Sequence, residues 1–230
     1  MKLLSVSTDA KTTKGESLGF LTGILYLAPS TVSKWNTCPM AKIAQCEKAC
    51  LYTAGRGAMN SVQKARIRKT EMLFDNTYSF MLQLAEDITK LVAKAKKLGL
   101  TPLVRLNGTS DIRWENIGIG DVKNIFTMFP EVQFYDYTKA ANRKDLPSNY
   151  DLTFSYSGVE GFQPFVQKAL LNNMRMAVVF RKEQDIPATF KGIRVVSGDN
   201  SDVRHLDDDG VIVGLYAKGK AKLDTTGFVV

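Results

Sequence analysis

All three cysteines of this chain lie in a single thirteen-residue segment, at Cys38, Cys46 and Cys50. Their spacing is Cys-x7-Cys-x3-Cys, and no cysteine occurs elsewhere in the sequence. Three thiolates on one short segment are suitable ligands for a soft metal ion or a metal cluster. A closed structural zinc site needs four ligands, whereas an iron–sulfur cluster with three protein ligands leaves one iron open. The segment therefore predicts a metal site, which we interpret as a [4Fe–4S] cluster with one free position.

Few other residues could take part in a metal site. His205 is the only histidine and lies far beyond Cys50 in the sequence, so a loop position is a better interpretation than a Cys3His zinc site. Gly55-Arg56-Gly57 follows the cysteines, where glycine would let the backbone approach a ligand and Arg56 would supply a counter-charge. A turn between two helices explains the same residues equally well. The acidic run Asp207–Asp209 is interpreted as a solvated turn.

The elements that must position these residues follow from hydrophobic periodicity. Strands are expected over residues 18–27, 102–107, 132–137, 152–156, 176–180, 193–197 and 211–216. Helices are expected from about residue 58 to 97 with a break near Asn76, and over 122–129 and 162–172. Gly99 after Lys96 and Lys97 is typical of a helix C-terminus.

This alternation predicts an α/β protein. Repeated strand–loop–helix units with short apolar strands imply parallel pairing, and their number favours a parallel-stranded partial (βα) barrel with the cysteine loop after the first strand. No linker or repeat divides the sequence, so residues 1–230 are expected to form a single α/β iron–sulfur domain. In such folds the chemistry gathers at the carboxyl ends of the strands.

Polar residues and glycines follow the predicted strands and would surround one pocket opposite the cysteines. The candidate cofactor-binding residues are Arg105, Asn107, Gly108, Asp111, Ser155, Tyr156, Ser197 and Asp199. Asp111 and Asp199 could accept hydrogen bonds from amino or hydroxyl groups, and Arg105 could bind a carboxylate or phosphate. Ordinary turns explain any one of these loops, and Asp111 could instead cap a helix. No catalytic residue is assigned.

Composition narrows the class of protein. The net charge of +8 favours an anionic partner, such as a nucleotide or a nucleic acid. The odd cysteine count argues against a disulfide framework, and no apolar run is long enough to span a membrane. A cytoplasmic protein with reduced thiols is expected.

A strand followed by a three-cysteine loop and βα units resembles the radical S-adenosylmethionine (SAM) superfamily. The resemblance implies a [4Fe–4S] cluster whose open iron binds the amino and carboxylate groups of SAM, with reductive cleavage that requires an electron donor. The usual spacing there is Cys-x3-Cys-x2-Cys, from which this chain departs. The glycine-rich segment of that superfamily has a loose counterpart in Asn107-Gly108-Thr109.

A closer resemblance is to phage- and plasmid-encoded proteins called gene product 88-like, whose function is uncertain. It rests on Cys38-Pro39-Met40-Ala41, Cys46 to Tyr52, Arg105 to Asp111, and Phe134-Tyr135-Asp136-Tyr137-Thr138 after Pro130. The match covers roughly residues 20–160. It implies an origin in a phage or another mobile element, and a location in the host cytoplasm if a phage encodes the protein.

We therefore expect an iron–sulfur redox or radical (SAM-type) enzyme acting on a nucleotide or nucleic acid. One alternative is a [4Fe–4S] sulfur-transfer enzyme, in which the open iron carries sulfide. The other is a zinc-bearing nucleic-acid-binding or replication protein, which needs a fourth ligand and a basic surface with exposed aromatic side chains.

Overall fold

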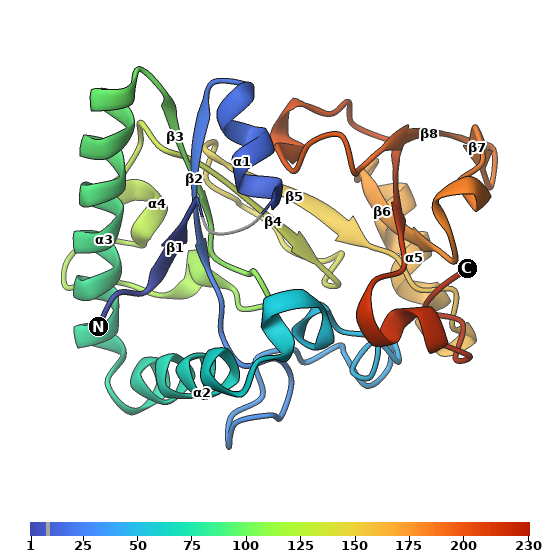
Figure 1. Ribbon diagram of the computed structural model, residues 1–230, viewed down its shortest axis with the longest axis horizontal. Coiled ribbons are helices and arrows are strands. Elements are labelled where there is room, and N and C mark those ends of the chain that lie inside the picture. Colours follow the sequence, from blue (N-terminus) through green and yellow to red (C-terminus); the bar gives the residue numbers. More distant parts are fainter. Residues whose placement is uncertain (8–9) are drawn as a thin grey trace.

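A nine-stranded mixed sheet forms the framework of the computed structural model, which describes residues 1–7 and 10–230 (Figure 1). The strand order is β1-β2-β3-β4-β5-β6-β9-β8-β7. The strands are β1 (Leu4–Val6), β2 (Phe20–Leu25), β3 (Thr101–Arg105), β4 (Gln133–Thr138), β5 (Tyr150–Ser155), β6 (Met176–Phe180), β7 (Thr189–Phe190), β8 (Ile193–Ser197) and β9 (Ile212–Tyr216).

The expected parallel-stranded partial (βα) barrel is wrong. Strands β2 to β6, β9 and β8 pair in parallel, but β1 joins β2 and β7 joins β8 in the antiparallel sense, so the sheet is mixed. The order also places β9 between β6 and β8. The β7–β8 hairpin turns at Lys191 and Gly192, which both have positive φ, a backbone conformation that favours such a tight turn.

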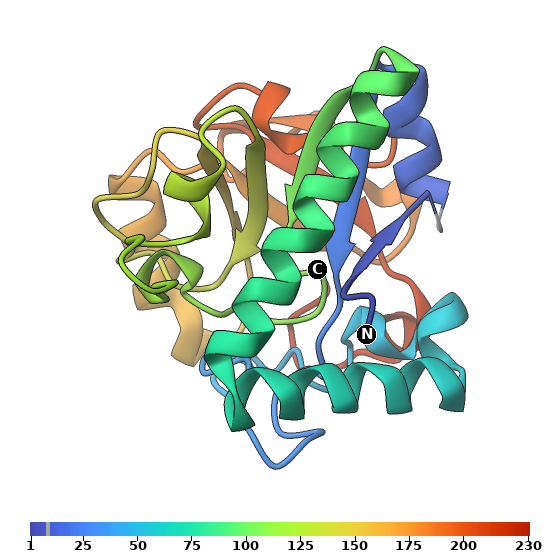
Figure 2. The ribbon, with the colours of Figure 1, turned by 90° about the vertical axis from the view of Figure 1, so that its left-hand side faces the viewer.

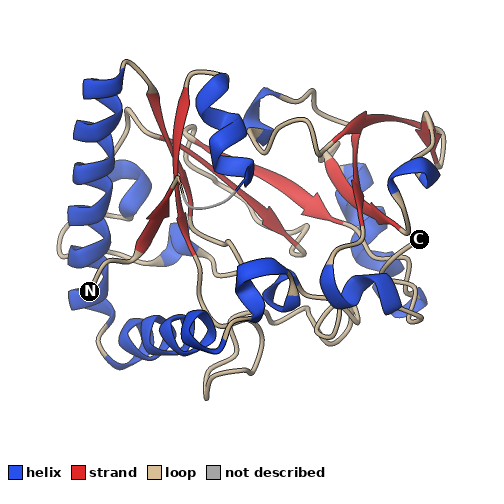
Figure 3. Cartoon of the chain, viewed as in Figure 1, coloured by secondary structure: helices blue, strands red, loops and turns tan. Residues whose placement is uncertain are grey.

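The repeated strand–helix unit of a barrel is missing because several connections carry no α-helix. The chain passes from β4 to β5 through residues 139–149 without a helix, and from β8 to β9 through the short 3-10 helix η6 (Arg204–Leu206). A third connection, from β6 to β7, holds only η5 (Glu183–Asp185). Figure 3 shows these connections as loops that contain at most a short helical turn.

The predicted long helical region is confirmed as two helices, α2 (Asn60–Asp75) and α3 (Thr77–Leu98). The chain breaks at Asn76, whose side chain accepts a hydrogen bond from the Ser79 N–H and so caps α3. Gly99 ends α3 with φ of 66°, a left-handed conformation that glycine adopts without strain. Figure 2 shows α3 crossing the sheet and α2 running beneath it.

The remaining helices are short. They are α1 (Ala10–Ser17), α4 (Ile125–Met128), α5 (Gln163–Leu171), and the 3-10 helices η1 (Leu51–Thr53), η2 (Gly55–Ala58), η3 (Trp114–Asn116), η4 (Glu160–Phe162) and η7 (Gly219–Leu223). No helix within the described residues is both long and apolar enough to cross a membrane.

The apolar core lies mainly between α3 and strands β1 to β5. Its side chains include Phe80, Leu84 and Ile88 from α3, and Val104 and Phe134 from the sheet, all fully buried. A second cluster packs α5 against β5 and β6 through Val166, Phe154 and Val178. Burial of these side chains fixes the sheet, because each removes from water an apolar surface that stabilises the fold by about 1.5–3 kcal/mol. The carboxyl ends of the parallel strands are thereby held together at one edge.

Candidate functional site: three thiols and two buried cations

The cysteine segment lies along the edge where the parallel strands end. In Figure 1 it is the blue loop at the lower side, between α2 and the red η7. It is tied to the strand ends by hydrogen bonds: Thr37 Oγ1 donates to Ala28 O at 2.6 Å, and Ser157 Oγ donates to Ala44 O at 2.9 Å. The Asp111 N–H donates to Thr37 O at 2.8 Å. The fold therefore holds the cysteine segment against the ends of β2, β3 and β5.

The three thiols line one cavity of about 260 Å³, here called the thiol cavity. Its walls are Pro29, Ser30, Thr31, Val32, Cys38, Ala41, Cys46, Glu47, Lys48, Cys50 and Tyr52. The thiols spread around it: Cys38 Sγ lies 3.7 Å from Thr109 O, and Cys46 Sγ lies 3.8 Å from Ala41 O. No group of three or more His, Cys, Asp or Glu side chains in the described chain is arranged to hold a metal ion.

Burial raises the pKa of all three thiols, because a thiolate is costly to place away from water. The pKa of Cys38 rises to about 12, although hydrogen bonds from the Ser30 backbone and the Thr37 side chain oppose the shift. Without a ligand the thiols are therefore protonated at neutral pH. A metal would have to displace those protons, which makes its binding pH-dependent.

Lys139 brings a buried cation to the thiols from the end of β4. Its Nζ donates to Ser155 O and to Ser155 Oγ, both at 3.1 Å, and lies over the Phe162 and Phe228 rings. The side chain is buried, and burial lowers its pKa, whereas thiolates at the three cysteines would raise it. No carboxylate of the described residues forms an ion pair with Lys139.

Arg66 of α2 is a second buried cation on the same side. Its guanidinium lies 4.7 Å from the Tyr26 ring and 5.6 Å from the Tyr52 ring, and Tyr52 lines the thiol cavity. Its Nε and Nη1 are buried and have no hydrogen-bond partner within the described chain. Burial lowers the pKa of Arg66, and a thiolate at Cys50 would raise it. Neither Arg66 nor Lys139 lines the thiol cavity itself, whose charged lining residues are Glu47 and Lys48.

Asp111 lies near the thiols, but its carboxylate is occupied by the protein. Oδ1 accepts from Thr138 Oγ1 at 2.7 Å, and Oδ2 accepts from the Lys139 N–H at 2.8 Å. Arg143 Nη1 is 3.8 Å from Oδ1. Asp111 therefore joins the loop after β3 to the end of β4, and it does not cap a helix.

Asn107 and Gly108 stabilise the loop after β3 through contacts within the protein. Asn107 Oδ1 accepts from Ser110 Oγ at 2.8 Å, the Ile112 N–H at 2.9 Å and Trp114 Nε1 at 3.1 Å. A Cβ at Gly108 would lie 2.6 Å from the Tyr26 ring, so only glycine fits there. Both residues have structural contacts that the sequence did not indicate.

The other predicted binding residues fall into two groups. Ser155 is at the site, where it accepts from Lys139, whereas buried Tyr156 packs edge-on against Phe190. Arg105 Nη1 pairs with Asp202 at 3.1 Å, in a buried ion pair away from the thiol cavity's lining.

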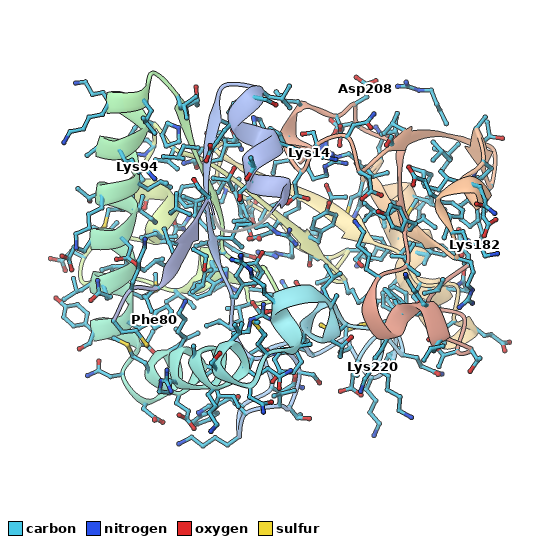
Figure 4. All side chains as sticks on the ribbon, viewed as in Figure 1. Lys14, Phe80, Lys94, Lys182, Asp208 and Lys220 are labelled. Atoms are coloured by element: carbon cyan, nitrogen blue, oxygen red, sulfur yellow. The ribbon has the colours of Figure 1, made fainter. Side chains whose placement is uncertain are left out.

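Ser197 and Asp199 follow β8 and are not part of the thiol cavity's lining. Asp199 pairs with Lys218 at 2.7 Å, and its carbonyl accepts from Lys14 at 2.7 Å. Figure 4 shows Lys14 on α1, on the opposite side of the molecule from Lys220 and the cysteine loop. These predicted residues are therefore not brought together with the cysteines.

His205 does not reach the thiols. Its ring lies edge-on to Phe20, at the first residue of β2, with the ring centroids 5.6 Å apart. The acidic run after it has cationic partners, since Asp207 pairs with Arg204 and Asp208 with Arg194.

Sequence reasoning missed Arg66, Glu47 and Tyr52 as neighbours of the thiols. Arg66 lies in an ordinary helical segment, and only packing turns it inward. Lys139 follows a predicted strand and could have been found there, because the carboxyl ends of parallel strands share one edge.

The fold and site define an α/β protein with three partly buried thiols at the carboxyl edge of a mixed sheet. The family model for gene product 88 matches residues 2–230, and the chain belongs to this family, as its cysteine and aromatic motifs predicted. The radical-SAM-like cysteine loop gains no support from this match. No curated protein and no solved structure matches the chain.

Proposed function

We propose that Cys38, Cys46 and Cys50 hold a [4Fe–4S] cluster in the thiol cavity, and that the protein is an iron–sulfur enzyme of redox or radical type. The observation that carries this proposal is the lining of one cavity by all three thiols of the chain. Thiolates are the usual protein ligands of iron–sulfur clusters. Cluster ligation by three cysteines leaves one iron without a protein ligand.

The buried cations support an anionic occupant. Burying a charge is unfavourable unless partners offset it. Lys139 has Ser155 and the nearby Asp111 carboxylate, whereas two guanidinium nitrogens of Arg66 have no hydrogen-bond partner within the described residues. Thiolates ligating a metal would restore the balance, because their negative charge faces both cations. Thiolates at all three cysteines would favour the charged form of Lys139, and a thiolate at Cys50 would favour the charged form of Arg66.

A cluster and a single zinc ion place different demands on the three sulfurs. A zinc site draws every sulfur to about 2.3 Å from one point, whereas a four-iron cluster places each thiolate on a different iron. Here Cys38 and Cys46 are directed at different backbone carbonyls around the cavity. The zinc-bearing alternative would take Glu47 as its fourth ligand, since Glu47 also lines the cavity and His205 does not.

The open iron defines the chemistry of the proposal. Its ligand would be SAM in a radical enzyme or sulfide in a sulfur-transfer enzyme, and a radical or redox reaction also needs an electron donor. The substrate is proposed to be anionic, a nucleotide or a nucleic acid, because the chain carries a net charge of +8. Lys139 and Arg66 would both offset thiolate charge at the cluster.

Anaerobic reconstitution tests the proposal. Purified protein is loaded with iron and sulfide, and iron, sulfide and zinc are then measured per chain with the absorption spectrum. Iron and acid-labile sulfide in stoichiometric amount, with a broad visible band, support the cluster. Colourless protein that retains stoichiometric zinc supports the alternative.

A second step separates the two cluster enzymes. SAM and dithionite are added to the loaded protein, and 5′-deoxyadenosine is measured. Its formation supports the radical enzyme. Its absence, together with loss of cluster sulfide to a nucleic acid, supports sulfur transfer.

A further inference from the structure

An exposed aromatic stack stands beside the thiol cavity. Trp35 and Phe74 lie face to face, with ring centroids 4.9 Å apart and an interplanar angle of 19°. Both remain about one third accessible, at 36% and 37%. Lys34 Nζ lies 5.5 Å from the Trp35 ring and pairs with Asp75 Oδ1 at 3.1 Å, so this cation is already matched by a carboxylate.

The stack and the cavity share one loop. Pro29 to Val32 form a wall of the cavity, and Trp35 follows three residues later. Three residues of chain span at most about 11 Å, so the ring is held close to the cavity wall. Figures 1 and 2 both show this loop projecting beyond α2.

The surroundings of the cavity are cationic. Exposed lysines come from the cysteine segment, Lys42 and Lys48, and from the last 3-10 helix, Lys220 and Lys222. That helix packs on the cysteine side, where the Lys220 N–H donates to Thr53 Oγ1 at 3.3 Å. Figure 4 shows Lys220 at this lower edge. Stacking rings with neighbouring cations fit a chain of bases and phosphates, because every base has a face to stack and every phosphate a charge.

We propose that this face binds single-stranded nucleic acid, with one base stacked on Trp35 and the phosphates along the lysines. The inference deepens the proposed function, because it names the substrate class that would reach the thiol cavity. A duplex fits less well, since its bases are already stacked on one another. The sequence-independent contacts predict little base preference.

The test uses the full chain, metal-free, with a labelled oligothymidylate of about 16 nucleotides, the upper end of common site sizes. Anisotropy gives the affinity at several salt concentrations. Trp35→Ala and Phe74→Ala should each weaken binding by about 5- to 150-fold. Trp35→Phe keeps an aromatic face and should stay closer to the wild type.

Charge is tested with a matched pair. Lys48→Ala, at an exposed lysine that lines the thiol cavity, should lower the slope of log affinity against log salt by about 0.7, the value for one phosphate contact on a single strand. Lys94→Ala, an exposed lysine at the far end of α3 in Figure 4, should leave the slope unchanged.

Fluorescence reports the stack directly. The chain has two tryptophans, and Trp114 is fully buried, so quenching by the oligonucleotide arises at Trp35. Equal affinity of Trp35→Ala and wild type, or equal binding of duplex and single strand without quenching, would overturn the proposal. The binding test uses metal-free protein, so its result does not depend on whether the protein loads iron. Failure to bind the oligonucleotide would likewise leave the cluster proposal unaffected.

Discussion

The Asp111 carboxylate accepts a hydrogen bond from the Lys139 backbone N–H at 2.8 Å, and this contact fixes the residue whose ammonium faces the thiols. The same carboxylate accepts from Thr138 Oγ1, so it holds the turn after β4 by two bonds. The geometry of the thiol cavity thus depends on a contact between the ends of two neighbouring strands.

Removal of this contact should cost stability. Asp111→Ala is expected to lower the free energy of unfolding by about 1.5–3 kcal/mol, the range for hydrogen bonds to a charged group. Asp111→Asn keeps one acceptor oxygen and should lose less. Urea unfolding monitored by circular dichroism measures both. If Asp111→Ala is as stable as wild type yet binds its ligand more weakly, Asp111 acts on the ligand itself.

Each cysteine should be required for cluster loading. Cys38→Ala, Cys46→Ala and Cys50→Ala are each expected to abolish iron binding, since two thiolates cannot hold a cubane stably. Iron and acid-labile sulfide per chain after anaerobic reconstitution give the answer. A single variant with full iron and sulfide would refute ligation by three thiolates.

Lys139→Met should make a bound cluster harder to reduce. The substitution keeps much of the side-chain volume but removes a positive charge that faces the thiols. The midpoint potential is expected to fall on the order of 60 mV, which corresponds to a tenfold change in a one-electron equilibrium. Lys168→Met on α5 is the matched exposed control. An unchanged potential in Lys139→Met would show that this ammonium does not act on the cluster.

His205→Ala should leave the metal content unchanged. The imidazole packs against Phe20 and Tyr135, at a distance from the thiol cavity's lining. Metal analysis of the purified variant checks this. Loss of metal would require a closed site with His205 as the fourth ligand.

Asp136 should make stability depend on pH. Burial raises its pKa to about 7, against the opposing effect of Arg105 and of hydrogen bonds from the Asn107 N–H and the Tyr150 hydroxyl. The folded state therefore holds a proton that the unfolded chain releases near pH 4, and stability falls as pH rises from about 4 through 7.

Asp136→Asn isolates this effect, because the amide has no proton to lose. The free energy of unfolding of wild type, relative to that of Asp136→Asn, should fall as pH rises across that window, by up to about 1.4 kcal/mol per pH unit. Unfolding free energies of both proteins at matched pH provide the comparison. A difference that stays constant from pH 4 to 7 would mean that Asp136 is ionised throughout.

Local sequence patterns predicted much of the secondary structure. The strands Met176–Phe180 and Ile193–Ser197 are confirmed at both ends, and Asn76 and Gly99 bound α3 as expected. The arrangement of the strands was not predictable in the same way. Strand order depends on long-range pairing, and the edge strands β1 and β7 are too short, at three and two residues, to leave a periodic pattern.

The candidate site was also predictable only in part from the sequence. The cysteines are neighbours in sequence, so their clustering was visible from spacing alone. Arg66 and Lys139 come from a helix and a strand end that only the folded sheet brings to the thiols. Asn107 and Arg105 looked available for a ligand, but a sequence does not reveal that a polar side chain is already bonded within its own protein.

The compactness of the cysteine segment has a thermodynamic consequence. In the proposed cluster all three sulfur ligands lie within thirteen residues, so the unfolded chain would keep a complete set of them and compete with the folded state for metal. Ligand binding stabilises a fold only through its preference for that fold over the unfolded chain. That preference must come from Lys139, Arg66 and the enclosing walls, which exist only after folding. The cysteine segment could therefore bind metal during synthesis, before the sheet forms. Folding of the rest of the chain around the metal would then raise the affinity and slow its release.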